Sequence, residues 1–243
     1  MVTERLPLFP LNTALFPGLV LPLHVFEERY RALVGDLLAL PEDGSRRFGV
    51  VAIKNGRDVA PTGQDGRDTG AAAGFGDDPM SALFGYGCVA DAAGIAARDE
   101  GEGGGYDLVA TGTVRFKLLS VSADGPYLTG EVEEVPEVTG AAANTLAGDV
   151  SRAFSAYQKR LAGSRERTLT AGQELPDDPT VLSYLVAAAM VADTPVKQLL
   201  LESPDSAARL ATEVRLLRRE TAIIEKLPSV PAFELTHQPI CAN

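Results

Sequence analysis

The spacing of apolar residues changes near residues 136–142, and this change limits the folds that the chain can adopt. Before it, apolar residues come in short runs, and apolar and charged residues alternate from Val114 to Leu118 with the period of two that is typical of a strand. After it, apolar residues recur at helical spacing. The sequence therefore predicts an α+β protein, with a β-rich unit over 1–138 followed by an α-helical bundle over 139–243.

The β-rich unit is expected to contain one early helix. From residue 27 to residue 40 apolar residues recur every three or four positions, which predicts an amphipathic helix ended by Pro41. Strands are expected at 6–11, 19–25, 48–53, 87–97, 106–121 and 127–135. Because most connections are too short for crossover helices, we expect these strands to be largely antiparallel and to close into a small barrel.

Six apolar residues lie where loop residues are usually polar. Two of them precede the turn at Pro17-Gly18, and four lie in a long loop rich in Gly, Ala and Asp at about 55–84. Apolar groups exposed in this way form recognition surfaces, whereas apolar groups that turn inward close the open end of a barrel, and both interpretations are open. The candidate binding residues are Leu15, Phe16, Phe75, Met80, Leu83 and Phe84.

The second half contains three signals for helix starts. Asp178-Pro179, Thr194-Pro195 and Ser203-Pro204 each place a capping side chain before a proline, which is preferred in the first turn of a helix. Another helix is expected at about 147–161, and the last helix is expected to end before Pro228. These signals predict the helical bundle.

Composition excludes several functional classes. A formal net charge of −11 over 243 residues disfavours nonspecific binding to nucleic acids, which depends on Lys and Arg. Cys88 and Cys241 are the two cysteines, and their separation favours neither a disulfide framework nor a zinc site. The uncharged stretch at 6–23 contains four prolines, so we expect neither a membrane helix nor an export signal. These features predict a cytoplasmic protein.

The sequence offers no clear catalytic motif. It has no phosphate-binding loop of the G-x-x-x-x-G-K-[ST] type, and the glycines at 101–105 precede a strand, as in a hairpin turn. His24 and Cys88 are conceivable as base and nucleophile, but a cysteine in a strand is usually a small buried apolar residue. Glu27 and Arg29 are interpreted as charges of the first helical turn. We therefore expect no catalytic residue, no cofactor and no metal.

Several blocks of the sequence resemble one family. The opening Leu-Pro-Leu-Phe-Pro-Leu at 6–11, then Leu-Phe-Pro-Gly at 15–18 and Leu-Pro-Leu-His-Val-Phe-Glu at 21–27 with Arg29-Tyr30, resemble the start of the N-terminal, substrate-binding domain of Lon proteases. Further similar blocks occur at 87–90, 112–116 and 197–202, so the resemblance runs from Leu6 to about Arg219. The loop at 55–84 departs from the family in length and glycine content.

The resemblance implies a fold and a function. It implies a PUA-like β pseudo-barrel followed by a helical bundle, standing alone without the ATPase and peptidase domains of Lon. The implied function is noncatalytic binding of unfolded protein or peptide segments, with a separate protease or chaperone as a further partner. The alternative for a PUA-like barrel is a pocket for a small molecule or a modified nucleotide, with or without catalysis.

Overall fold

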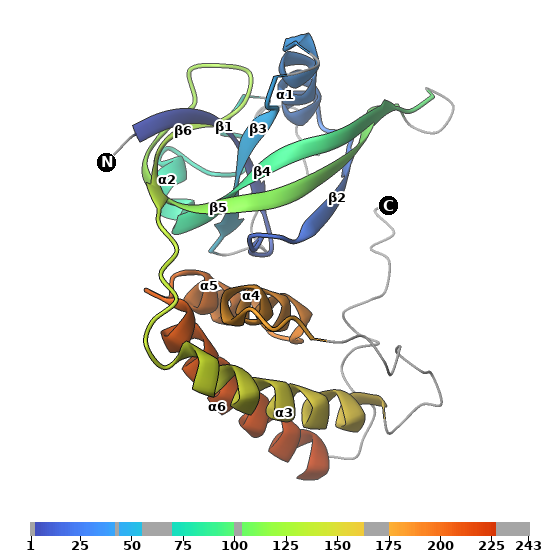
Figure 1. Ribbon diagram of the computed structural model, residues 1–243. Helices are drawn as coiled ribbons and strands as arrows, with labels where there is room; N and C mark the ends of the chain where they lie inside the picture. The colour runs from blue at the N-terminus through green and yellow to red at the C-terminus, as the bar shows by residue number, and fades with distance from the viewer. Residues whose placement is uncertain (1–2, 42–43, 55–69, 100–103, 163–174, 227–243) are drawn as a thin grey trace. The chain divides into compact units, whose positions relative to one another are not determined.

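The computed structural model describes residues 3–41, 44–54, 70–99, 104–162 and 175–226 (Figure 1). The chain has an α+β fold, with six strands in its first part and long helices toward the C-terminus, as the sequence predicts. It forms two compact units. The barrel unit comprises the residues up to Glu137 together with Asp193–Glu202, and the helical unit comprises Val138–Ala192 and the residues from Ser203 onward.

The barrel unit is built on one six-stranded sheet. Its strands are β1 (Thr3–Leu11), β2 (Val20–Val25), β3 (Arg47–Ile53), β4 (Leu83–Ala97), β5 (Tyr106–Ser122) and β6 (Thr129–Val135). They are ordered β2-β5-β4-β3-β1-β6, and a further pairing of β5 with β6 closes the sheet into a barrel. Among the described strands only β1 and β3 pair in parallel, so the predicted, largely antiparallel barrel is confirmed.

Closure depends on the length of β5 and on close approaches between strands. β5 has 17 residues and pairs with β2, β4 and β6, and its register shifts twice against β4 and once against β6. Such irregularities bend a strand and help a sheet to curve. At Gly87 of β4 a Cβ atom would lie 2.4 Å from the Val50 carbonyl oxygen and 2.3 Å from the Phe116 ring. Only glycine fits this position without a shift of the neighbouring strand.

The early helix packs one face into the barrel core. Helix α1 (Glu28–Ala39) buries four residues at helical spacing, namely Tyr30, Leu33, Val34 and Leu37. Tyr30 stacks on Phe9 of β1, with their ring centroids 4.3 Å apart. The helix ends at Ala39, and Leu40 has extended backbone angles, because a residue that precedes proline is driven out of the helical conformation. The predicted helix is therefore confirmed.

The predicted loop at 55–84 is shorter in the structure. Residues 55–69 lie outside the described residues, and 79–82 form a short helix α2 (Pro79–Ala82) that the sequence did not predict. Leu83 and Phe84 belong to β4, because Leu83 pairs with Ile53 and extends the antiparallel pairing of β3 and β4. The interpretation of these two residues as loop residues was wrong.

Helix α5 (Thr194–Leu201) belongs to the barrel unit although it lies far along the sequence. Gln198 is buried and donates from Nε2 to the Tyr86 carbonyl oxygen at 3.0 Å. The guanidinium of Arg115, also buried, donates to the Leu201 carbonyl oxygen at 2.8 Å. A division of the sequence at 138/139 had placed α5 in the bundle. Its contacts are long-range, so no local pattern distinguishes it from the other helices.

The helical unit contains three long helices around one apolar core. They are α3 (Ala143–Ala162), α4 (Pro179–Ala189) and α6 (Ser206–Lys226). The core includes Val150 and Phe154 of α3, Leu182 of α4 and Leu210 and Leu217 of α6, all buried. No described helix of the protein is both long and apolar enough to span a membrane.

Aspartates cap three of the helices. Asp178 accepts from the backbone N–H groups of Thr180 and Val181 at 2.8 and 2.9 Å, as predicted. At α5 the cap is Asp193 rather than Thr194, and at the start of α6 Asp205 rather than Ser203 accepts from Ala208 N at 2.7 Å. The two shifted caps have one physical reason. An aspartate lies one residue before Thr194 and two residues after Ser203, and an aspartate cap is at least as favourable as Ser or Thr.

Candidate functional site

The structure places most of the candidate binding residues in the core. Leu15, Phe16, Phe75 and Leu83 are at most 6% exposed, whereas Met80 and Phe84 are half-buried. Of the two interpretations that the sequence left open, inward packing therefore applies to four of the six. The reason is energetic, because burial of a large apolar side chain stabilises the fold by roughly 1.5–3 kcal/mol. Among the six, only Phe75 lines the cavity described next.

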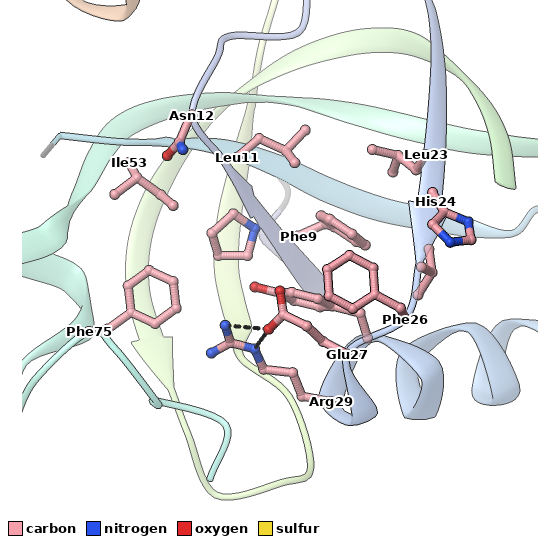
Figure 2. A pocket seen from close by; sticks show the side chains of 13 residues that line it. Phe9, Leu11, Asn12, Leu23, His24, Phe26, Glu27, Arg29, Ile53 and Phe75 are labelled. Atoms are coloured by element: carbon pink, nitrogen blue, oxygen red, sulfur yellow. Dashed lines mark hydrogen bonds and ion pairs between the residues drawn. The ribbon is translucent and has the colours of Figure 1, made fainter. Parts of the chain in front are cut away.

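The barrel unit has a cavity of about 300 Å³ that opens to solvent. The end of β1, the end of β2, the start of α1 and the end of β3 surround it, and Phe75 forms a further wall (Figure 2). Its lining residues are Phe9, Pro10, Leu11, Asn12, Leu23, His24, Val25, Phe26, Glu27, Arg29, Tyr30, Ile53 and Phe75. Segments far apart in the sequence thus converge on one site.

The walls of the cavity are mainly apolar and aromatic. The stacked rings of Phe9 and Tyr30 form a fixed surface that is part of the barrel core. Phe26 lies at the end of β2, and 63% of its surface is exposed. A large exposed aromatic residue beside an apolar cavity is typical of a recognition site.

Arg29 and Glu27 place a buried ion pair in this apolar cavity. The Arg29 side chain is only 9% exposed, and its Nε and Nη2 donate to Oε2 of Glu27 at 2.9 and 2.8 Å. Its Nη1 donates to the Ala73 carbonyl oxygen at 2.7 Å, and its guanidinium lies 4.8 Å from the centre of the Tyr30 ring. Each nitrogen of the buried cation therefore has an acceptor, as burial of a charge requires.

The interpretation of Glu27 and Arg29 as simple charges of the first helical turn was incomplete. Residues two apart in a helix do not face each other, but Glu27 has extended backbone angles as the N-cap of α1. This conformation turns the Glu27 carboxylate back toward Arg29. Both residues lie in the block from residue 21 to residue 30 that resembles the family, but the resemblance did not indicate that they form an ion pair.

Tyr30 presents a neutral hydroxyl group at the site. Burial raises the pKa of Tyr30 to about 12, an effect that Arg29 opposes and Glu27 reinforces. The hydroxyl group is therefore protonated throughout the physiological range, and Tyr30 contributes an uncharged aromatic wall.

His24 and Cys88 do not form a catalytic pair. His24 Nδ1 lies 3.0 Å from Oδ1 of Asp107, and the pKa of Asp107 is lowered, first by this hydrogen bond and then by Arg98. Cys88 is fully buried and does not line the cavity; burial raises the pKa of its thiol to about 12, so it carries no nucleophilic thiolate. Within the described residues, no three His, Cys, Asp or Glu side chains gather as a metal site would require.

The family of the chain follows from comparison with known proteins. The model of the ATP-dependent protease La (LON) substrate-binding domain matches residues 5–219. The chain belongs to the LON substrate-binding domain family. It is 28% identical over 229 residues to a Lon protease of Anaeromyxobacter dehalogenans and 27% identical over 228 residues to Lon protease 2 of Myxococcus xanthus. These matches cover 90% and 92% of the chain but 24% of each relative, so the chain spans about a quarter of their length.

Solved structures of LON N-terminal domains share the fold. The N-terminal domain of the Mycobacterium avium complex Lon protease superposes with a TM-score of 0.54 at 21% identity, over 90% of this chain and 98% of that one. A Lon N-terminal domain protein of Xanthomonas campestris gives a TM-score of 0.53 at 22% identity, over 88% of this chain and 98% of that one. The α+β fold expected from the resemblance is thus the fold of this family.

Proposed function

We propose that the chain is a noncatalytic module that binds unfolded or extended protein segments at the barrel cavity. The observation that carries the proposal is the open cavity of about 300 Å³ with the aromatic walls Phe9, Tyr30 and Phe75 beside the exposed Phe26. Membership of a substrate-binding domain family supports it. The buried cation of the cavity, Arg29, already donates to Glu27 and to the Ala73 carbonyl oxygen, which disfavours the alternative of a polar small-molecule site.

The size of the cavity sets the strength of binding. Burial of one large apolar side chain contributes roughly 1.5–3 kcal/mol, so a single anchored residue gives weak and rapidly reversible binding. Such binding is suitable for a protein that holds many different unfolded chains and releases them. We propose that the released segments pass to a separate protease or chaperone in the cytoplasm.

Phe26→Ser tests the site without entering the core. Because the Phe26 ring is 63% exposed, the variant is expected to fold normally and to bind an unfolded model protein at least about fivefold more weakly, since roughly 1 kcal/mol of apolar contact is lost. Isothermal titration calorimetry with a reduced, carboxymethylated model protein measures this affinity.

Val20→Ser is the matched control. Val20 is also 63% exposed, lies on β2 and does not line the cavity, so its variant should bind like the wild type. Equal affinity of all three proteins, or no measurable affinity of the wild type, would contradict the proposed function.

A further inference from the structure

We infer that the cavity selects tyrosine and tryptophan side chains over phenylalanine, because Glu27 offers one free oxygen to a donor on an aromatic ring. This inference rests on the proposed function and specifies the residue that anchors a bound segment. It is carried by the lining of the cavity, by the hydrogen bonds of Glu27 and by the prolines in the neighbouring strands.

The Glu27 carboxylate uses only one of its oxygens within the protein. Both donors from Arg29, Nε and Nη2, reach the same atom, Oε2, at 2.9 and 2.8 Å. Figure 2 shows these two bonds among the side chains that line the cavity. Among the described residues Oε1 has no hydrogen-bond partner, and the Glu27 side chain is 28% exposed, so Oε1 is open to a ligand.

The acceptor is held in place before any ligand arrives. Arg29 is fixed from the other side by the Ala73 carbonyl oxygen at 2.7 Å and packs against the rings of Tyr30 and Phe75. The carboxylate it holds therefore loses little conformational freedom when a ligand binds. A preorganised charged acceptor in a mostly apolar cavity makes a stronger hydrogen bond than one in water.

Prolines disfavour recognition of the ligand backbone. β2 pairs with β5 along one edge, and Pro22 at its centre has no N–H to donate to an added strand. A proline in an edge strand such as β2 blocks the addition of a further strand. Pro10 of β1, which lines the cavity, likewise has no N–H group for the backbone of a ligand. Selectivity must then come from the side chain that enters the cavity.

Tyrosine and tryptophan combine the two properties that this cavity can recognise. Each has a flat apolar body for the walls formed by Phe9, Tyr30 and Phe75, and each ends in an O–H or N–H group that Oε1 of Glu27 can accept. Phenylalanine fills the same space but would cover Oε1 without a donor. We therefore expect about a tenfold preference for tyrosine over phenylalanine, the scale of one hydrogen bond to a charged group.

The test compares capped pentapeptides that differ only in the central residue. Tyrosine, O-methyltyrosine, tryptophan and phenylalanine are titrated into the full chain, and dissociation constants come from amide chemical shifts in nuclear magnetic resonance spectra. The tyrosine and tryptophan peptides should bind about tenfold more tightly than the phenylalanine and O-methyltyrosine peptides. In Glu27→Ala the four affinities should converge, whereas Glu28→Ala, which removes a neighbouring exposed charge, should retain the preference.

The outcomes separate this inference from the proposed function. If all four peptides bind the wild type equally at the cavity, the inference is overturned and the proposed function stands. If the preference persists in a folded Glu27→Ala protein, the inference is also overturned. If no peptide shifts the signals of the cavity residues, both are overturned. The comparison of tyrosine with O-methyltyrosine decides the inference on the wild type alone, even if Glu27→Ala does not fold.

Discussion

Glu213 is one of the ionisable side chains that the fold buries completely. It lies on α6 with no exposed surface, and neither carboxyl oxygen has a hydrogen-bond partner among the described residues. Burial raises the pKa of Glu213 to about 8, although the positive charge of Arg209, one helical turn earlier, lowers it. The group is therefore largely protonated in the folded protein at neutral pH, because a neutral carboxyl costs less to bury than a charged one.

The raised pKa makes the stability of the protein depend on pH. Between about 4.5 and 8 the folded state holds a proton that the unfolded state has released, so the free energy of unfolding falls as the pH rises. Relative to Glu213→Gln, the wild type should lose up to about 1.4 kcal/mol per pH unit in this window and nothing below it. Urea unfolding of both proteins at pH 5, 6.5 and 8, followed by circular dichroism, measures the difference. A constant difference between them would refute a raised pKa at Glu213.

At the candidate site, the sequence shows the character of each residue but not its burial or its partners. The apolar character of Phe75 and Leu83 was visible, but their burial was not, because it depends on neighbours such as Ile53 that are distant in the sequence. Arg29 was visible as a charge, but its partner carbonyl at Ala73 lies 44 residues away. Local patterns specify which residues are apolar or charged, whereas the closed barrel determines which of them meet.

At the scale of elements the sequence was more informative. The strands at 48–53 and 106–121 and the helix at 27–40 were predicted within about two residues. Their apolar runs and periods are local signals, and so is Pro41, which ends the helix. Helix α2 was missed, since four residues are too few to establish a helical period. The membership of α5 in the barrel unit was missed because hydrogen bonds from Gln198 and Arg115 establish it, and these are long-range.

The cap of α4 offers a test at this scale. Asp178→Ala removes the acceptor of two backbone N–H groups and should destabilise the helical unit by about 1 kcal/mol. Asp177→Ala removes the same charge from the exposed preceding residue and should change the free energy of unfolding by less than about 0.5 kcal/mol. Urea unfolding curves of the two variants give both values. If the two substitutions had equal effects, charge rather than capping would be responsible.

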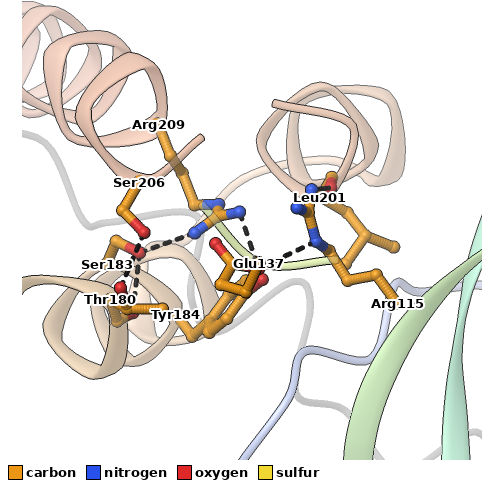
Figure 3. A network of polar contacts seen from close by, with 8 residues as sticks. All are labelled: Arg115, Glu137, Thr180, Ser183, Tyr184, Leu201, Ser206 and Arg209. Atoms are coloured by element: carbon orange, nitrogen blue, oxygen red, sulfur yellow. Dashed lines mark hydrogen bonds and ion pairs between the residues drawn. The ribbon is translucent and has the colours of Figure 1, made fainter. Parts of the chain in front are cut away.

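At the scale of the whole molecule, the barrel unit is discontinuous in sequence. Arg115 of β5 is 1% exposed, and its partners are Leu201 of α5, at 2.8 Å, and Glu137, at 3.1 Å (Figure 3). Residues up to Glu137 therefore contain every strand of the sheet but lack one helix that satisfies a buried cation. Breaking a buried ionic contact from one side is strongly destabilising.

A fragment of residues 1–137 should therefore be much less stable than the barrel unit of the intact chain. It should unfold at a lower temperature, and a second fragment in which residues 193–202 follow residue 137 through a flexible glycine-serine linker should regain much of the lost stability. Circular dichroism melting curves of the two fragments compare their Tm values. If 1–137 melted at the same temperature as the linked fragment, α5 would be dispensable to the barrel.

The late position of α5 also affects how the protein emerges from the ribosome. The strands of the barrel are complete at Glu137, but the last segment of that unit ends at Glu202, after α3 and α4. At about 5–20 residues per second, synthesis of the intervening 65 residues takes roughly 3–13 s. During that interval Arg115 of the nascent barrel lacks its hydrogen bond to the Leu201 carbonyl oxygen. In the same interval α3 and α4 lack α6, with which they share a core. Synthesis of the helical unit therefore begins before the barrel unit is complete, so the two units are synthesised in an interleaved order.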